Sequence, residues 1–185
     1  MKKILSILLI VFLTVGLVAC SDKPKENKDL EKSPKGENEV VDPVESTATI
    51  YFGTEEGYLR AETVIIEGEL TADKGQELIE KIIAGTSNED TLNVLPQGLQ
   101  VLNYHFDEET GIATIDFSEH IFAVAGSMGE SLAVYSVVNT LTELPGVEKV
   151  QFLVEGEKVE QIGGHIYMAD PLEAEPHLLE GNTLK

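Results

Sequence analysis

Residues 127–154, SMGESLAVYSVVNTLTELPGVEKVQFLV, decide the fold of this chain. Ser127 is followed three residues later by Glu130, the spacing of a capping box, in which two side chains satisfy backbone N–H groups at the start of a helix. From residue 130 to 144, apolar side chains then recur with helical spacing, as in Val134, Val137, Val138 and Leu141. The pattern predicts a helix that begins at this capping box.

A narrow polar stripe runs along this helix, while the rest of its circumference is apolar. The stripe consists of Ser136, Asn139, Thr140 and Glu143. A helix with so much apolar surface must be largely buried, so we expect Val138 and Leu141 in the core and Glu143 at the surface. Pro145 and Gly146 end the helix, and alternation over residues 150–154 predicts a strand directly after it.

The first 19 residues have the pattern of a secretory signal. Two lysines precede an apolar run over residues 4–18, which is shorter than the roughly 20 residues of a membrane span. The run ends in Leu17, Val18, Ala19 and Cys20, which resembles the bacterial lipobox, where a signal peptidase cuts before a lipid-modified cysteine. We therefore predict removal of residues 1–19 and lipidation of Cys20, with acyl chains such as palmitate giving stable anchoring. The alternative is an ordinary signal with an incidental cysteine.

Three further segments follow the signal. Residues 20–46 have the composition of a flexible charged linker, because Lys, Glu, Asp, Pro and Ser dominate and few side chains could enter a core. The folded domain is predicted over residues 47–172. Residues 173–185 form a C-terminal tail, which we expect to be loose from Pro176 onward. Cys20 is the one cysteine of the chain, so no intramolecular disulfide can form.

The charge of the chain excludes some partners. Its formal net charge is −20, and 25 of its 33 acidic residues follow residue 46. Nucleic acid is an unsuitable partner because phosphate binding needs a basic surface, and an anionic membrane surface should repel the folded domain. The acidity favours solubility, with a cationic partner as the alternative.

Alternation of apolar and polar residues predicts the strands of the domain, which are residues 49–52, 58–67, 99–106, 112–117, 149–154 and 159–162. A first helix is expected between the second and third of these, from a cap at Thr71 to Gly85. Gly111 should be left-handed, at the end of a hairpin loop. The order ββ-α-ββ-α-ββ predicts an α+β fold with two helices packed on one face of a mainly antiparallel sheet. The second helix would then be a crossover connection.

The one local cluster that suggests catalysis consists of Asp116, Ser118 and His120. A hydrolase triad is assembled in space rather than from neighbours on one strand end, and the nucleophile-elbow motif is absent from the sequence. We expect instead that Ser118 caps a short helical piece. The loop at residues 126–129 lacks the lysine and the spacing of a P-loop. The sequence therefore predicts no catalytic residue.

The sequence predicts no metal or cofactor site either. The four histidines, His105, His120, His165 and His177, show no helical pairing, and the folded domain contains no cysteine. The acidic residues 107–109 lack the alternating oxygen ligands of a calcium loop. Tyr51, Phe52 and Tyr58 could line a small pocket, but core packing is the better interpretation.

Two segments together resemble a known family. They are GIATIDFSEHIF at residues 111–122 and VVNTLTELPGVEKVQFLVEGEKVEQIGGHIYMADPL at residues 137–172. The V-x-F-x-V-x-G strand and the G-G-x-I-x-x-x-x-P-L ending are their most specific parts. The chain is similar here to the GerM domain, also called the sporulation and spore germination domain, of bacterial lipoproteins. The resemblance covers most of residues 47–172. It implies no enzymatic reaction, and the family includes proteins outside sporulation.

The order of elements also resembles the ring-building motif of secretion-system and sporulation-channel proteins, which implies subunit interfaces on the sheet and helices. We therefore expect a non-catalytic interaction module on the extracytoplasmic face of the cell membrane, anchored through Cys20. Its partners would be envelope or sporulation proteins, or further copies of itself. The alternatives are a binding module for a cell-wall or small-molecule component and an unrecognised hydrolase. The edges expected to bind partners are the hairpin over residues 99–117 and the strand over 159–162.

Overall fold

Residues 44–182 are the part of the chain that the computed structural model describes, and the predictions for the signal segment and Cys20 lie outside them. The strands are β1 (Glu45–Gly53), β2 (Leu59–Glu67), β3 (Val101–Asp107), β4 (Ile112–Phe117), β5 (Lys149–Val154) and β6 (Glu157–Lys158). The helices are α1 (Gly75–Ala84), α2 (Gly126–Thr142) and the 3-10 helices η1 (Ala72–Lys74), η2 (Glu119–Ala123) and η3 (Pro176–Leu178). This is the predicted order ββ-α-ββ-α-ββ. Strand β1 begins two residues before the predicted start of the domain at residue 47.

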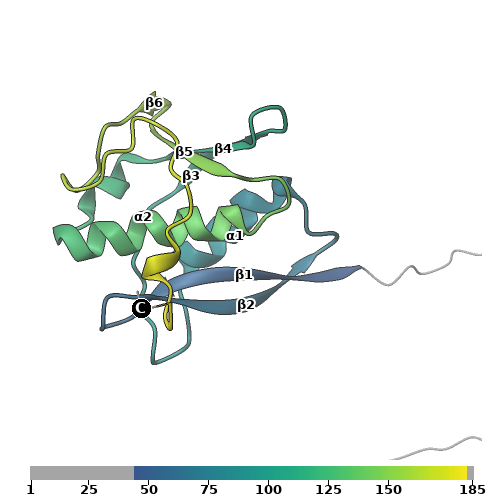
Figure 1. Ribbon diagram of the computed structural model, residues 1–185, viewed down its shortest axis with the longest axis horizontal. Coiled ribbons are helices and arrows are strands. Elements are labelled where there is room, and N and C mark those ends of the chain that lie inside the picture. The colour runs from purple at the N-terminus through teal and green to yellow at the C-terminus, as the bar shows by residue number, and fades with distance from the viewer. Residues whose placement is uncertain (1–43, 183–185) are drawn as a thin grey trace, which may run out of the picture. The chain divides into compact units, whose positions relative to one another are not determined.

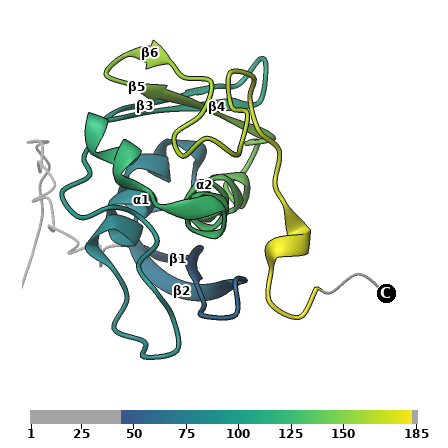
Figure 2. The same cartoon turned by 90° about the vertical axis from the view of Figure 1, so that its left-hand side faces the viewer.

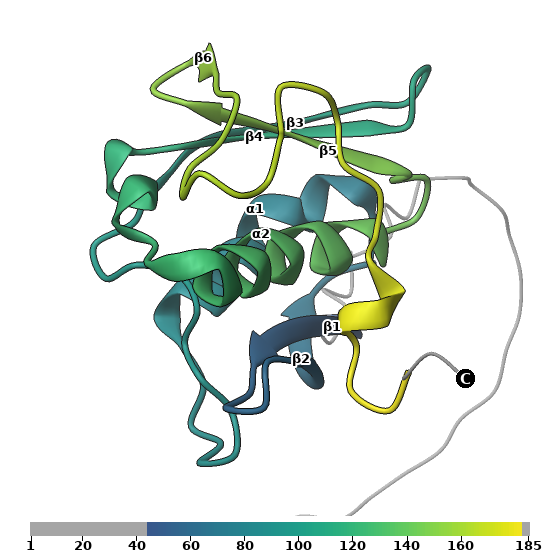
Figure 3. The ribbon, with the colours of Figure 1, turned by 60° about the vertical axis from the view of Figure 1, so that its left-hand side comes forward.

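The two α-helices lie between two separate sheets (Figures 1 and 2). Strands β3, β4, β5 and β6 form one sheet in that order, whereas β1 and β2 pair only with each other. Figure 3 shows α1 and α2 on one face of the four-stranded sheet, with the β1–β2 hairpin on their other side. The predicted α+β class, with both helices on one face of a sheet, is confirmed. The sequence patterns did not indicate that the first strand pair would form a layer of its own.

Strand pairing is mainly antiparallel, as predicted. The exception is the central pair of the larger sheet, β4 and β5, which runs parallel with Ile115 opposite Phe152. Two parallel neighbours need a long connection that returns the chain to the same end of the sheet, and the 17 residues of α2 lie in that connection. The predicted crossover is therefore present. Gly111 has a φ of +69° in the turn between β3 and β4, which confirms its left-handed conformation.

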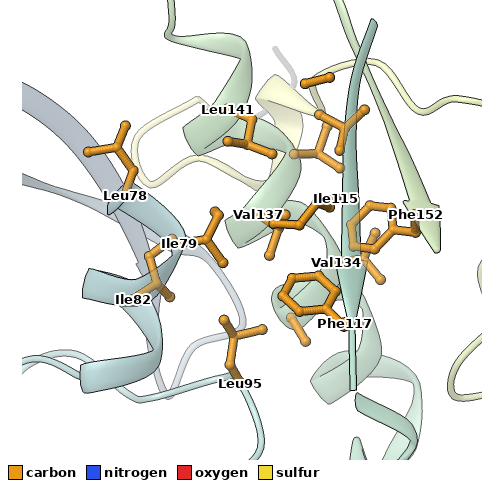
Figure 4. Packing of buried hydrophobic residues seen from close by; sticks show 14 of the residues in the cluster. Leu78, Ile79, Ile82, Leu95, Ile115, Phe117, Val134, Val137, Leu141 and Phe152 are labelled. Atoms are coloured by element: carbon orange, nitrogen blue, oxygen red, sulfur yellow. The ribbon is translucent and has the colours of Figure 1, made fainter. Parts of the chain in front are cut away.

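The core fills the space between the helices and the four-stranded sheet and extends to the β1–β2 hairpin through Ile50 and Phe52. Figure 4 shows side chains of α1, α2, β4 and β5 in one cluster, with Val137 and Leu141 on α2 and Phe117 and Phe152 on the strands. The two phenylalanine ring centroids are 6.1 Å apart, within the range of favourable aromatic pairs. Leu141 is fully buried and Glu143 is exposed, so the predicted orientation of the helix is confirmed.

The two predicted helix caps are wrong. Helix α2 begins at Gly126, its N-cap is Ala125, and no side chain caps it. Glu130 is fully buried and binds a distant loop, so it cannot complete a capping box with Ser127. Thr71 precedes η1 rather than α1, and its side chain makes no capping hydrogen bond. The short spacing pattern of a cap does not reveal that a glutamate is required elsewhere.

The last predicted strand is also wrong. Strand β6 consists of Glu157–Lys158, and residues 159–162 lie outside it. The turn before it is present, with positive φ angles at Glu155 and Gly156. Beyond Lys158 the chain turns inward, because the side chains of Ile162 and Met168 are buried in the core. The demand for core packing therefore overrides the short alternating pattern.

The C-terminal segment is not loose over its described part. The side-chain oxygen of Asn139 accepts a hydrogen bond from the Glu175 N–H at 2.8 Å, and the side-chain nitrogen of Asn139 donates to the Glu175 carbonyl at 3.3 Å. Leu179 forms a bridge with Leu59 of β2. Arg60 pairs with Glu180 at 2.6 Å. The prediction of a loose tail is therefore wrong up to residue 182, because contacts with α2 and β2 hold the segment in place.

No helix within residues 44–182 combines the length and the apolar composition needed to cross a membrane.

Candidate functional site

Asp116, Ser118 and His120 lie where β4 ends and η2 begins. The Ser118 hydroxyl oxygen is 3.5 Å from Nδ1 of His120 and accepts a hydrogen bond from the Gln100 N–H at 3.2 Å. The Asp116 carboxylate accepts a hydrogen bond from the Gly156 N–H at 3.0 Å. The structure therefore brings the serine and histidine together but joins the aspartate to the turn between β5 and β6.

This arrangement lacks the relay that activates a serine nucleophile. In a triad the carboxylate binds the histidine, which in turn binds the hydroxyl. Within residues 44–182, Asp116 forms no hydrogen bond with His120, and the Ser118 side chain is buried. Ser118 occupies the N-cap position of η2, as predicted, although its side chain bonds to Gln100 rather than to the helix. The hydrogen bonds of this cluster thus attach the end of β4 to Gln100 and to the turn between β5 and β6.

Metal binding has no support in residues 44–182, since no group of three or more His, Cys, Asp or Glu side chains there could hold an ion. The four histidines lie on separate segments and are all exposed. Tyr51 and Phe52 are buried in the core and Tyr58 is half-buried, which confirms packing as the main role of the first two.

Glu130, which was predicted to complete a capping box with Ser127, instead binds the backbone of a distant loop. Its two carboxylate oxygens accept hydrogen bonds from the N–H groups of Gly163 and His165, each at 2.8 Å. A Cβ atom at Gly163 would lie 2.9 Å from the Glu130 carboxyl carbon, so the contact requires a glycine at that position. A buried carboxylate needs such donors, because an unpaired one would lose its hydration without compensation. Glu130 therefore fixes the loop that follows β6.

The polar stripe of α2 faces β1 and the C-terminal segment. The Thr140 hydroxyl accepts a hydrogen bond from the Tyr51 N–H at 3.1 Å, and the Tyr51 hydroxyl donates to Glu143 at 2.7 Å. Burial, together with the bond to this carboxylate, raises the pKa of Tyr51 above its ordinary value. Asn139 holds Glu175, as described above. The polar stripe therefore attaches α2 to β1 and to the C-terminal segment through hydrogen bonds, rather than forming a face surrounded by solvent.

A hollow of about 520 Å³ lies between η1 and the β3–β4 hairpin. It is lined by the apolar residues Phe106 and Pro145 and by Gly146, and also by the carboxylate-bearing residues Glu69, Asp73 and Glu108. Its lining contains no lysine, arginine or histidine. Negative charge that develops in a reaction would therefore meet carboxylates rather than cations, which is the reverse of what an oxyanion site requires.

An edge of the larger sheet is open. Strand β3 is the terminal strand, and its backbone bonds within residues 44–182 go to β4 and to its own hairpin turn. Its register shifts between Val101 and Asn103, and Leu102 in that interval is 45% exposed. Strand β6, at the opposite edge, has only two residues. Of the edge predicted over residues 99–117, β3 does lie at the edge of the sheet, but β4 is an inner strand that pairs on both sides, and residues 159–162 form no strand.

A family model with the description "Germane: Sporulation and spore germination" matches residues 49–160. The chain belongs to this family. The match begins within β1 and includes every later helix and strand up to β6. The chain thus carries a sporulation- and germination-related domain of the Germane type. No protein with a curated description matches the chain.

Several solved structures have a similar fold. The first GerMN domain of the sporulation protein GerM from Bacillus subtilis is 22% identical with a TM-score of 0.59, and the match covers 69% of this chain and 97% of that chain. The tandem GerMN domains of the same protein give 21% identity and a TM-score of 0.60, over 70% of this chain and 46% of that one. A Clostridium perfringens protein whose name describes it as a putative lipoprotein is 21% identical with a TM-score of 0.52. That match covers 75% of this chain and 93% of the other chain. At these identities the likeness shows the fold.

The motifs that resemble the GerM domain have structural explanations in this member of the Germane family. Val150, Phe152 and Val154, the apolar positions of V-x-F-x-V-x-G, are all buried, and Gly156 has a φ of +82° in the following turn. The first glycine of the G-G pair is Gly163, which the Glu130 carboxylate contacts closely. The motifs therefore record packing and loop attachment, and none of these residues forms a catalytic constellation.

Proposed function

We propose that this domain is a non-catalytic interaction module, held by a lipid on Cys20 at the extracytoplasmic face of a bacterial cell membrane, where it supports assembly of a sporulation, germination or other envelope complex. Family membership supports a role in sporulation or germination, and the lipobox-like segment at residues 17–20 supports anchoring at the membrane. The similarity to a protein named as a lipoprotein agrees with it. The absence of a triad or metal cluster in residues 44–182 favours binding over catalysis.

The open edge of β3 is the observation that carries the proposal. An edge strand presents a row of N–H and C=O groups, and a partner strand that pairs with them extends the sheet. β3 has seven residues, enough for a partner to form several backbone hydrogen bonds. The exposed Leu102 side chain adds an apolar contact next to that row. A partner strand is therefore the occupant that this edge fits.

The test uses tagged protein extracted from membranes in mild detergent. Leu102→Lys should reduce the amount of partner recovered with the tagged protein, because a charged side chain on an edge strand opposes the pairing of another strand with it. Ile65→Lys is the matched control, since Ile65 is a similarly exposed aliphatic residue on β2. Equal recovery of partners by both variants would contradict the assignment of the interface to β3.

The anchor is tested separately. Mass spectrometry of membrane-extracted protein should show an N-terminal Cys20 that carries a diacylglyceryl group, and Cys20→Ala should move the protein out of the membrane fraction. Recovery of Cys20→Ala in the membrane at the native level would refute lipid anchoring while leaving the β3 interface open to its own test.

A further inference from the structure

Helix α1 and the turn η1 before it lie against β3, the strand with the open edge. The Tyr104 hydroxyl of β3 donates a hydrogen bond to the Ala72 carbonyl at 2.8 Å. A Cβ atom at Gly75 would overlap with the Tyr104 ring, so this side of α1 faces the strand. The side-chain nitrogen of Lys74 donates to the Glu67 carbonyl at 2.6 Å, so a second side faces the end of β2.

The exposed side of this helical segment carries a polar row of Asp73, Gln76 and Glu80, which are spaced i, i+3 and i+7. Leu78 is fully buried on the opposite side of α1, within the core. The row therefore lies on the outer flank of α1, next to the open edge of β3. The pKa of Tyr104 agrees with this placement, since burial raises it above its ordinary value and the nearby charge of Asp73 raises it further.

The hollow of about 520 Å³ continues this flank at the hairpin end of β3. It adds the carboxylates of Glu69 and Glu108 to that of Asp73, and none of the three forms an ion pair within residues 44–182. Phe106 of β3 and Pro145 give the same hollow an apolar surface. A lysine or arginine side chain suits this combination, because its methylene stem covers apolar surface while its charged end stays in water beside the carboxylates.

A strand that pairs with the β3 edge would point every second side chain toward this flank. Residues directly opposite each other in two paired strands have Cβ atoms about 5 Å apart on the same face of the sheet. Phe106 lines the hollow, so the partner residue opposite Phe106 projects beside it, on the side where the hollow lies. The partner residues two positions away lie on the same face, above the polar row that contains Asp73 and Glu80.

We propose that the strand that pairs with β3 is basic, with lysine or arginine at alternate positions on its helix-facing side and one of these side chains in the hollow. This inference rests on the strand pairing proposed above and names the chemistry of the partner. A second copy of this chain fits less well, because pairing two β3 edges would bring two acidic flanks together. A neutral strand would leave the carboxylates without an opposite charge.

The binding test uses full-length ¹⁵N-labelled protein in a non-ionic detergent and two blocked heptapeptides as probes. One is Thr-Arg-Val-Arg-Val-Arg-Thr, and the other has glutamine in place of each arginine. The arginine peptide should shift the backbone amide signals of Tyr104 and Phe106 and should bind about tenfold more tightly than the glutamine peptide, since several partly solvated ion pairs add to the strand pairing. High salt should reduce this difference.

The outcomes separate this inference from the proposed function. Equal binding of the two peptides at β3 would overturn the basic partner but leave the β3 interface standing. No shift in β3 with either peptide would refute strand pairing itself, and the inference with it. Shifts by the arginine peptide only at Glu55 and Glu89, which line a different hollow, would show unspecific attraction to an acidic domain and would also overturn the inference.

Substitutions provide an independent measurement. Asp73→Asn combined with Glu108→Gln should weaken binding of the arginine peptide about fivefold and change binding of the glutamine peptide less than about twofold. Glu55→Gln combined with Glu89→Gln is the matched control, because it also removes two exposed carboxylates but outside this flank. Equal losses from both pairs would contradict the assignment. A dimer in analytical ultracentrifugation that strengthens with salt and is abolished by Leu102→Lys would assign the edge to a second copy instead.

Discussion

The two sides of α2 are buried by different means. The side that faces the four-stranded sheet is apolar and packs through Val134, Val137 and Leu141 against strands β4 and β5 (Figure 4). The side that faces β1 and the C-terminal segment is polar and is buried through the hydrogen bonds of Asn139 and Thr140. The same helix thus joins the four-stranded sheet by apolar packing alone, and joins β1 by directed hydrogen bonds in addition to the packing of Leu132 against Tyr51. Apolar packing tolerates small shifts, whereas hydrogen bonds fix the position of β1 and of residue 175.

The apolar side should show the largest effect. Leu141→Ala removes a fully buried side chain and should lower the free energy of unfolding by roughly 2–5 kcal/mol. Glu143→Ala, at an exposed position two residues further along the chain, should cost less than about 1 kcal/mol. Chemical denaturation of both variants measures the difference. Equal midpoints would mean that the apolar side does not dominate the stability of α2.

The buried end of the helix comes next. Glu130→Ala leaves the N–H groups of Gly163 and His165 without their acceptor and should cost about 2–4 kcal/mol. Hydrogen exchange of these two amides should become faster as the loop detaches. Glu157→Ala, at an exposed glutamate on β6, serves as the control and should be nearly neutral. Slow exchange in the Glu130 variant would show that the loop is held by other contacts.

The polar stripe offers a near-isosteric test. Thr140→Val keeps the side-chain volume but leaves the Tyr51 N–H facing a methyl group, which should cost about 1–2 kcal/mol. Thr63→Val, at an exposed position on β2, should change stability by less than about 0.5 kcal/mol. Thermal unfolding of the pair measures the contribution of the directed bond. A neutral Thr140→Val would indicate that shape alone is sufficient on this side as well.

The smallest effect concerns the hydrogen bond between the Tyr51 hydroxyl and Glu143, the exposed residue of the polar stripe, and it depends on pH. Because the pKa of Tyr51 is raised in the folded state, the unfolded chain loses this proton first once the pH passes about 10. The stability from the tyrosine is thus fully present below that pH and is lost as the pH rises above it. Tyr51→Phe should cost about 0.5–1 kcal/mol at neutral pH and should reduce the alkaline loss. If Tyr51→Phe loses stability at alkaline pH as steeply as the original protein does, the hydrogen bond of the Tyr51 hydroxyl does not contribute to the stability of the fold.

The fold could be predicted from the sequence where periodicity was long, as over α2 and over β4, whose residues 112–117 were predicted without error. Short patterns were less informative. The Ser127–Glu130 spacing satisfied a capping rule, yet the glutamate was needed by a loop more than 30 residues away. The unpaired oxygen of Gln151 could not be predicted either, because it depends on where the Met168 carbonyl lies. The lipidation of Cys20 remains a prediction.

The sequence by itself determined the element order, the buried face of α2, and the family, because these depend on local periodicity and on motifs within single strands and turns. Only the tertiary structure decided which polar groups form hydrogen bonds inside the domain and which are left without a partner there. The physical reason is that a hydrogen bond requires both partners in space. Glu130 and Asn139 found theirs in distant segments, while Oε1 of Gln151 found none within the described residues.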